Sequence, residues 1–320
     1  MLLEISDLSI EFTSEDTTIR AVEKVSLSLD RGQVLGLVGE SGCGKSVTSM
    51  SIPRLLPSPP ASIPQGKIIF DGEDLLAMPI AKLRKIRGNK IGVIFQDPMT
   101  ALSPLHHIGK QLQEIIHLHR NVSRKESRKT ALEWLEKVGI PDASSKIDAY
   151  PYELSGGMQQ RVVIAMALIL EPDLIIADEP TTALDVTIQA QVLRLMRDLH
   201  RKESALLLIT HDMGVISQMA THIAVMYAGQ IVETAEAGKF FDSPQHPYSQ
   251  ALLRALPSAN TRGQPLESIP GYVPSAGNFP TGCRFHNRCA SVMPQCSLKE
   301  PQLKAVAPGH CARCLLFDKA

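Results

Sequence analysis

The chain has 320 residues, a length that allows one large domain with an appendage or two domains. Its 33 Lys and Arg residues balance its 33 Asp and Glu residues, so the composition gives no support for binding to nucleic acid or to a strongly acidic surface. No run of 18 or more apolar residues occurs, and no secretory signal opens the chain. These features predict a cytosolic protein that does not itself span a membrane.

The N-terminal part of the chain predicts a small antiparallel sheet. Residues 2–12 and 21–29 alternate between apolar and polar side chains on either side of a polar turn at 14–18, and residues 67–70 predict a third strand. Phe12 at the end of the first strand is a candidate for stacking on an adenine ring, and a buried strand aromatic is an equally good interpretation.

The most informative stretch is GESGCGKS at residues 39–46, which fits the pattern G-x-x-x-x-G-K-[ST]. It lies between an apolar run at 34–38, read as a strand, and a segment that can be helical from Lys45. Such a loop holds a polyphosphate with backbone N–H groups and the positive end of the following helix. Lys45 is expected to reach the β and γ phosphates, and the Ser46 hydroxyl is expected to bind Mg²⁺.

The middle of the chain predicts a linker, a strand and a helical insert. Prolines at 53–64 predict a surface linker, and residues 90–95 predict a short buried strand. Gln96 at the end of that strand is a candidate contact for Mg²⁺ or the attacking water, or an ordinary turn residue. Apolar spacing predicts helices over 108–138, interrupted by a basic stretch at 120–129 that reads as a solvated face.

A second anion site is indicated by LSGGMQQR at residues 154–161, just before an apolar helical segment at 162–170. The Ser155 hydroxyl and the free N–H groups at the helix start would face one point, and a simple helix cap is the alternative. If one ATP needs both anion sites and they lie on opposite lobes, two chains must face each other head to tail.

Two carboxylates follow an apolar strand at 174–177. Asp178 is expected to hold Mg²⁺, and Glu179 is expected to polarise the water that attacks the γ phosphate. Asp185, which follows in the stretch PTTALD, is a candidate contact with a partner chain. His211 ends another predicted strand at 206–209 and is a candidate donor to the γ phosphate, although a lone histidine is more often structural.

The remaining predicted elements close the nucleotide domain. A helix is expected over 188–200. Residues 223–227 and 230–233 predict a hairpin that turns at Ala228 and Gly229.

These motifs, in this order, resemble the ATP-binding subunit of an ABC transporter over residues 2–233. The resemblance implies an α/β fold with a P-loop NTPase core, an antiparallel β subdomain, a helical insert and a small Cys-rich C-terminal extension. It implies that Asp178 binds Mg²⁺ with Ser46 and Gln96, that Glu179 is the catalytic base, and that His211 and Lys45 contact the γ phosphate. The other residues implied to bind ATP are Phe12, Gly39, Ser41, Gly42, Cys43, Gly44, Val47, Ser155, Gly156, Gly157 and Asp185. Met158 departs from the Gln commonest at its position, although LSGGM is similar to the peptide-importer branch.

The C-terminal part resembles one branch of that family. The segment HPYSQALLRALP at 246–257, followed by IPGYVP and GCRFHNRC, is similar to the tail of the oligopeptide, dipeptide and nickel importer ATPases. That branch implies a second, different ATPase subunit, two membrane permeases and an extracytoplasmic binding protein, with this chain peripheral on the cytoplasmic face of the inner membrane. The cargo implied is a dipeptide or oligopeptide, with nickel, a metal chelate or an antimicrobial peptide as the alternative.

Five of the six cysteines follow residue 280, which favours a metal site over a disulfide framework in a cytosolic chain. The family tail resembles a four-cysteine arrangement that holds a [4Fe–4S] cluster, and Cys283, Cys289, Cys296 and Cys314 match it. Cys311 departs from the pattern and is an alternative fourth ligand. Zinc and free thiols are the other interpretations.

The expected division is a nucleotide-binding domain over 1–240, with its helical subdomain at about 100–160, and an extension over 241–320. Two other functions are the alternatives. A soluble ABC-type ATPase acting on DNA ends or ribosomes would carry a long coiled coil or two nucleotide domains, and this chain has neither. A regulator without turnover is disfavoured by the intact Glu179 and His211.

Overall fold

The structure is a computed structural model that describes residues 1–15, 17–182, 185–256 and 268–318. Contacts divide it into two compact units, Met1–Leu29, Gln33–Leu76 and Ile209–Ala320 in the first, and Asp30–Gly32 and Ala77–Leu208 in the second. Parts of the predicted turn at 14–18, of PTTALD and of the segment ending at residue 257 lie outside the described residues. The predicted domain boundary at 240 stays a prediction, because the two units are defined by packing and residue 240 lies inside the segment Ile209–Ala320 of the first unit.

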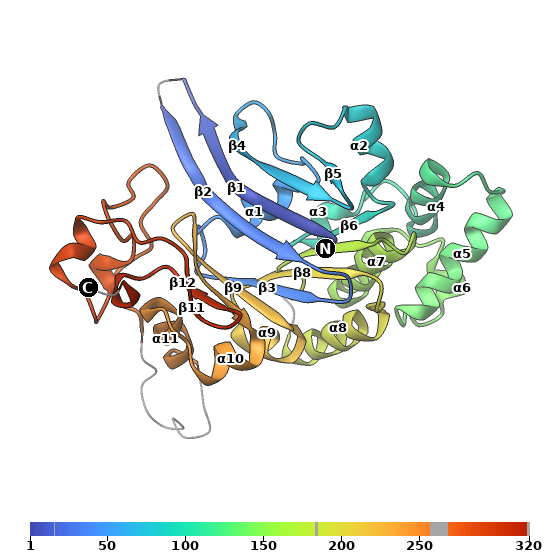
Figure 1. The fold of residues 1–320 in the computed structure, drawn as a ribbon. Helices are drawn as coiled ribbons and strands as arrows, with labels where there is room; N and C mark the ends of the chain where they lie inside the picture. Colours follow the sequence, from blue (N-terminus) through green and yellow to red (C-terminus); the bar gives the residue numbers. More distant parts are fainter. Residues whose placement is uncertain (16, 183–184, 257–267, 319–320) are drawn as a thin grey trace. The chain divides into compact units, whose positions relative to one another are not determined.

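The first unit contains the predicted antiparallel sheet, whose strand order is β2-β1-β4-β5 (Figure 1). Its strands are β1 (Leu3–Thr13), β2 (Thr18–Leu29), β4 (Ala61–Phe70) and β5 (Glu73–Asp74). Leu3 pairs with Leu29 across β1 and β2. Leu3, Ile5, Leu8 and Ile10 of β1 are buried, as their apolar pattern predicts. The prediction of two N-terminal antiparallel strands is therefore confirmed.

Strand β4 shows that the predicted linker at 53–64 is too long. The strand begins at Ala61 and pairs with β1, with Ser62 opposite Glu11 and Gln65 opposite Ser9. Pro64 has no N–H to donate, and the ladder is irregular between those two pairs. A proline at such an irregularity leaves the strand intact, which composition alone did not indicate.

The first unit also contains a mixed set of strands in the order β11-β12-β10-β9-β3. Strand β3 (Val34–Val38) runs parallel to β9 (His222–Tyr227), and β9 forms a hairpin with β10 (Gln230–Glu236). The hairpin turns at Ala228 and Gly229, both at positive φ, as the sequence predicts. The helices of this unit are α1 (Lys45–Ser51), α9 (Met213–Met219), α10 (Ala237–Asp242) and α11 (Pro247–Arg254).

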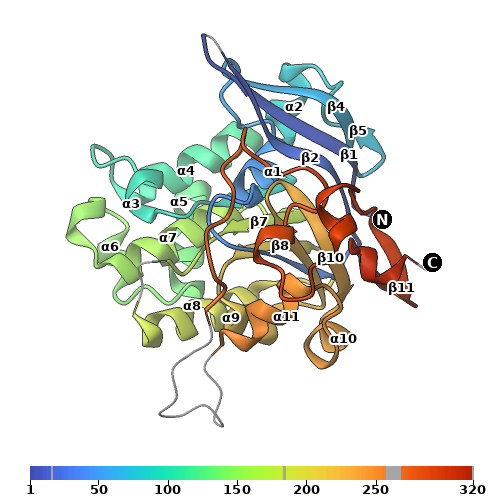
Figure 2. The same cartoon turned by 90° about the vertical axis from the view of Figure 1, so that its left-hand side faces the viewer.

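The C-terminal tail packs on this hairpin (Figure 2). Its strands β11 (Lys304–Ala307) and β12 (His310–Ala312) were not predicted, and β12 pairs with β10. Phe285 of the tail is buried, with ring contacts to Tyr227 at 5.2 Å and to Tyr248 at 5.3 Å. Single-turn helices occupy His286–Arg288, Pro294–Ser297 and Leu315–Phe317. The tail thus shares the core of the first unit.

The second unit contains three strands in the order β8-β7-β6. They are β6 (Ile91–Ile94), β7 (Leu174–Asp178) and β8 (Ala205–Thr210), and β6 and β7 are parallel. Its helices are α2 (Ile80–Ile86), α3 (Pro98–Ala101), α4 (Ile108–His119), α5 (Arg124–Lys137), α6 (Ala143–Lys146), α7 (Gly156–Leu168) and α8 (Val186–Leu199), with a single turn at Pro151–Glu153 (Figure 1). None of the helices in the described residues is long and apolar enough to span a bilayer.

The helical insert is divided at a capping box. The Ser123 hydroxyl accepts a hydrogen bond from the Glu126 N–H, and the Glu126 carboxylate accepts one from the Ser123 N–H. This reciprocal pair starts α5 inside the predicted basic stretch, since it satisfies backbone donors that have no partner within the helix. Arg128 of that stretch forms a bidentate pair with Asp148 at 2.8 and 2.7 Å on the surface. The basic run is therefore a solvated helix face, as predicted.

Candidate nucleotide site

The phosphate loop of the first unit connects β3 to α1, as the motif predicts. Gly42 and Gly44 have φ values of 80° and 107°, which side chains disfavour. A Cβ at Gly39 would lie 2.1 Å from the Met226 carbonyl oxygen, so only glycine fits there. Ser41, Gly42 and Ser46 are exposed, while Val47 is half-buried. The loop therefore has the glycine backbone and the exposed rim of a phosphate cradle.

Lys45 is folded back into this loop. Its ammonium group donates to the carbonyl oxygens of Gly39 at 2.8 Å and Glu40 at 3.0 Å, and the side chain is buried. The Cys43 thiol lies 3.8 Å from the same ammonium, and burial raises the pKa of Cys43. Cys43 is thus a small buried thiol that supports the loop.

In the second unit, Gln96 and Glu179 are brought together. The Gln96 side-chain amide donates to Glu179 Oε2 at 3.2 Å, and the Thr182 hydroxyl donates to the same oxygen at 2.8 Å. Glu179 has a φ of 47°, a left-handed conformation that is uncommon outside glycine and often found at functional sites. Asp178, the last residue of β7, is buried. Two donors therefore fix the carboxylate expected to be the base.

The predicted signature residues and Asp185 line one cavity of about 540 Å³ in the second unit. Ser155, Gly156 and Gly157 lie at the start of α7, where the Ser155 hydroxyl accepts from the Met158 N–H at 3.4 Å. Asp185 caps α8 by accepting from the N–H groups of Thr187 and Ile188 at 3.0 and 2.9 Å. The N-terminus of α7, a feature that suits an anion, and the N-terminus of α8, which Asp185 caps, therefore flank a single hollow.

Phe12 and His211 are placed on the first unit. Phe12 is half-exposed near the end of β1, between its partners Ile19 on β2 and Ala61 on β4. His211 is exposed between β8 and α9, and the adjacent Asp212 caps α9.

The four cysteines matched to the family pattern gather in the tail. The pKa of the Cys283 thiol is raised to about 11, chiefly by burial, and the Cys314, Cys296 and Cys289 thiols are near enough to contribute to that rise. Cys311 is not among them. All six cysteines are free. Among the described residues, however, no group of three or more His, Cys, Asp or Glu side chains is arranged to hold a metal ion. The predicted [4Fe–4S] cluster stays a prediction.

Sequence reasoning missed a set of residues that supports the loop from the C-terminal extension. Glu40 occupies a variable position of the motif, yet its carboxylate is paired with Arg288 and its N–H donates to Tyr248. Tyr248 and Arg288 lie in segments quoted above only for their resemblance. No local pattern connects positions 248 residues apart.

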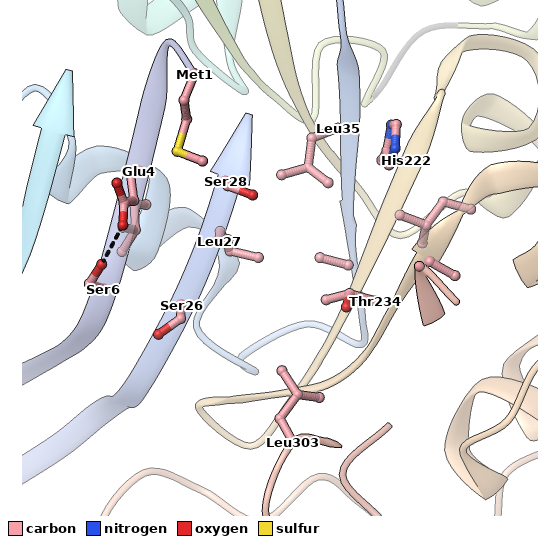
Figure 3. A pocket seen from close by; sticks show the side chains of 15 residues that line it. Met1, Glu4, Ser6, Ser26, Leu27, Ser28, Leu35, His222, Thr234 and Leu303 are labelled. Carbon is pink, nitrogen blue, oxygen red and sulfur yellow. Dashed lines mark hydrogen bonds between the residues drawn. The ribbon is translucent and has the colours of Figure 1, made fainter. Parts of the chain in front are cut away.

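The first unit also has a cavity of about 420 Å³ between β1, β2 and the strands β3, β9 and β10 (Figure 3). Met1, Glu4 and Ser26 line one side, and Leu35 and His222 line the other. None of its lining residues belongs to the phosphate loop.

Two family models match two separate parts of the chain. Residues 22–182, half of the chain, match the family model "ABC transporter", and residues 232–296 match "Oligopeptide/dipeptide transporter, C-terminal region". The chain is 46% identical to the oligopeptide transport ATP-binding protein OppD of Bacillus subtilis over 97% of this chain and 87% of that protein. It is also 46% identical to the dipeptide transport ATP-binding protein DppD of Escherichia coli over 98% of this chain and 96% of that protein.

Solved structures agree on the fold. A dimeric, post-hydrolysis structure of the ATP-binding cassette MJ0796 bound to ADP and Pi matches with a TM-score of 0.66 at 28% identity, covering 74% of this chain and 99% of that one. CbiO1 from Clostridium perfringens, part of the ABC transporter complex cbiONQ, matches with a TM-score of 0.63 at 25% identity, covering 76% of this chain and 91% of that one. The predicted P-loop α/β fold is therefore confirmed. The chain belongs to the ABC transporter ATP-binding subunits that hydrolyse ATP, in the branch with an oligopeptide/dipeptide transporter C-terminal region.

Proposed function

We propose that this chain is the ATP-hydrolysing motor of a membrane importer for dipeptides or oligopeptides. The observation that supports the cargo is the match of residues 232–296 to the C-terminal region of oligopeptide/dipeptide transporters. Relatives such as OppD and DppD are named for transport of those peptides. ATP binding would close two ATPase subunits, and hydrolysis would reopen them and pass the movement to the permeases.

The proposed chemistry assigns one role to each polar group. Lys45 and the loop N–H groups bind the phosphates, and Ser46, Gln96 and Asp178 hold Mg²⁺, which neutralises charge on the phosphates when bound. Glu179 accepts a proton from the attacking water, while Gln96 and Thr182 hold its Oε2. His211 donates to the γ phosphate. Phe12 stacks on the adenine ring.

The signature cavity is proposed to bind the ATP of a second subunit. Ser155, Gly156 and Gly157 would offer a hydroxyl and helix N–H groups to the phosphates, and Asp185 would contact the facing chain. The partners proposed are a second, different ATPase subunit, two permeases and an extracytoplasmic binding protein. The chain would then lie peripherally on the cytoplasmic face of the inner membrane.

A metal centre in the tail is proposed to use Cys283, Cys289, Cys296 and Cys314. The grouping of the thiols supports this proposal, because Cys289, Cys296 and Cys314 lie close enough to Cys283 to raise the pKa of its thiol, and Cys311 is not among them. Sulfur ligands suit a [4Fe–4S] cluster or zinc. Anaerobically purified protein should contain iron and sulfide in equal amounts, whereas stoichiometric zinc without colour would overturn the cluster.

The cargo is tested with the transporter reassembled from this chain and the proposed partners, which are the two permeases, the second ATPase and the binding protein. In proteoliposomes, dipeptides or oligopeptides should stimulate ATP hydrolysis and accumulate inside the vesicles. Stimulation by a nickel chelate or an antimicrobial peptide, without response to short peptides, would assign the alternative cargo of the same family.

A further inference from the structure

The C-terminal extension contacts the phosphate loop through an ion pair between Arg288 and Glu40. Arg288 Nη1 donates to Glu40 Oε2 at 2.7 Å, and Arg288 Nη2 donates to Glu40 Oε1 at 3.0 Å. The Arg288 side chain is 5% exposed, and that of Glu40 is 31% exposed. Bidentate pairs of this kind combine charge with a fixed geometry.

Arg288 is itself fixed within the first unit. Its Nε donates to the Pro270 carbonyl oxygen at 2.8 Å, and its Nη1 lies 3.4 Å from the Tyr227 hydroxyl. Burial disfavours the charged guanidinium, but the hydrogen bonds with Glu40 and Tyr227 outweigh it and raise the pKa of Arg288. The residue is therefore a permanent cation in a rigid position.

A second contact reaches the backbone of the same loop residue. The Glu40 N–H donates to the Tyr248 hydroxyl at 2.9 Å, and Tyr248 is fully buried against Tyr227 with ring centroids 4.7 Å apart. The Glu40 carbonyl oxygen accepts from Lys45 at 3.0 Å. The amide, the carbonyl and the carboxylate of Glu40 are thus all engaged, two of them by the extension.

These contacts have a direct electrostatic consequence for a polyphosphate. Glu40 places a negative charge on the loop that binds the phosphates of ATP, and an uncompensated carboxylate there would repel them. Arg288 compensates that charge, and together with Tyr248 it fixes the start of the loop. We propose that Arg288 and Tyr248 are positioning residues for ATP binding, so the C-terminal extension is a working part of the nucleotide site.

The test measures nucleotide affinity in the full-length chain with a fluorescent ATP analogue. Arg288→Met should raise the Kd for ATP about 10-fold, equivalent to about 1.4 kcal/mol. The kcat at saturating ATP should stay within about twofold of wild type, because the loop binds the phosphates equally in the ground state and in the transition state. The loss should shrink with added salt, because screening weakens repulsion by Glu40. The double variant Arg288→Met, Glu40→Gln should bind within about threefold of wild type.

A matched control is available in the same tail. Arg313 is also buried, and its side chain donates to the carbonyl oxygens of Ile231 at 2.8 Å and Pro301 at 3.2 Å, neither of which belongs to the phosphate loop. Arg313→Met should lower thermal stability and leave the Kd unchanged. If Arg288→Met does not fold, Tyr248→Phe removes only the hydroxyl and should raise the Kd about threefold. Wild-type affinity in Arg288→Met or in Tyr248→Phe, or equal losses in Arg288→Met and Arg313→Met, would overturn the proposal.

Discussion

Gln96 donates a hydrogen bond to Glu179, with 3.2 Å between the Gln96 side-chain nitrogen and Glu179 Oε2. The two residues follow the adjacent parallel strands β6 and β7, whose carboxyl ends meet at one edge of the sheet. Glu179 also has a left-handed φ of 47°, so its side chain leaves the strand end in a direction that regular β backbone does not give.

Gln96→Ala removes one of the two donors that hold the Glu179 carboxylate. We expect kcat for ATP hydrolysis to fall about 10- to 100-fold, because an unoriented base loses part of the rate gain of general base catalysis. At saturating Mg²⁺ this loss should remain, whereas at limiting Mg²⁺ the KM for ATP should also rise, because Gln96 is also proposed to hold the metal. Steady-state phosphate release measures both constants. Gln113→Ala, which removes a hydrogen bond to the Gly109 carbonyl oxygen within α4 instead, is the control, and an unchanged kcat in Gln96→Ala would contradict the orienting role.

Two glycines of the phosphate loop should respond differently to alanine. A Cβ at Gly39 would lie 2.1 Å from the Met226 carbonyl oxygen. A Cβ at Gly42 would meet no atom within 4 Å, so the only cost of alanine there is the strain of its φ of 80°. Without nucleotide, Gly39→Ala should therefore lower the free energy of unfolding by several kcal/mol and Gly42→Ala by about 1 kcal/mol. Urea unfolding distinguishes the two. Equal losses would mean that the close approach of Met226 to Gly39 is not maintained in solution.

His246 should make the protein less stable in acid. Burial, followed by the nearby charge of Arg313, lowers the pKa of His246 to about 3, against 6.5 for the exposed side chain. At a pH between these two pKa values, His246 is protonated in the unfolded chain and neutral in the folded chain. Its contribution to the free energy of unfolding is therefore fully present above pH 6.5 and is lost as the pH falls. Between pH 7 and pH 5 the loss from this group is about 2 kcal/mol.

The matched variant for this effect is His246→Asn. His246 caps α11 through Nδ1, which accepts from the Tyr248 N–H at 3.0 Å, and asparagine keeps a capping acceptor without titrating. Urea unfolding at both pH values should give a smaller acid loss for the variant. The same loss in both proteins would exclude His246 as its source.

Cysteine variants separate the two candidate fourth ligands of the proposed metal centre. Cys314 interacts with Cys289 and Cys296, so Cys314→Ser should lose most of the bound metal, while Cys311→Ser should keep it. Iron, zinc and sulfide analysis of anaerobically purified protein provides the measurement. The reverse result would assign Cys311, and no metal in the wild-type protein would leave the thiols free.

Local patterns predicted much of the fold. Strands β1, β2, β3, β7 and β9 have alternating or continuous apolar residues, and the phosphate loop is defined by glycines that must adopt unusual backbone angles. The division of the helical insert depended on a local signal that was present but not used, the Ser and Glu three residues apart at 123 and 126.

The features that could not be predicted from the sequence depend on contacts between distant segments of the chain. Strand β12 has only three residues and gains its stability from pairing with β10, so it has no period of its own. Arg288 and Tyr248 acquire their roles from Glu40, which the motif treats as a free position. The gathering of Cys283, Cys289, Cys296 and Cys314 depends likewise on folding of the tail.

The central claim is that Glu179 activates water for hydrolysis of ATP bound by the Lys45 loop. Its most direct measurement compares ATP binding, turnover and dimer formation in the wild type and in Glu179→Gln, which keeps the shape of the side chain and removes its basicity. We expect the variant to bind ATP as the wild type does, to hydrolyse it at least 100-fold more slowly, and to accumulate as an ATP-bound dimer. Hydrolysis at the wild-type rate in Glu179→Gln would contradict the account.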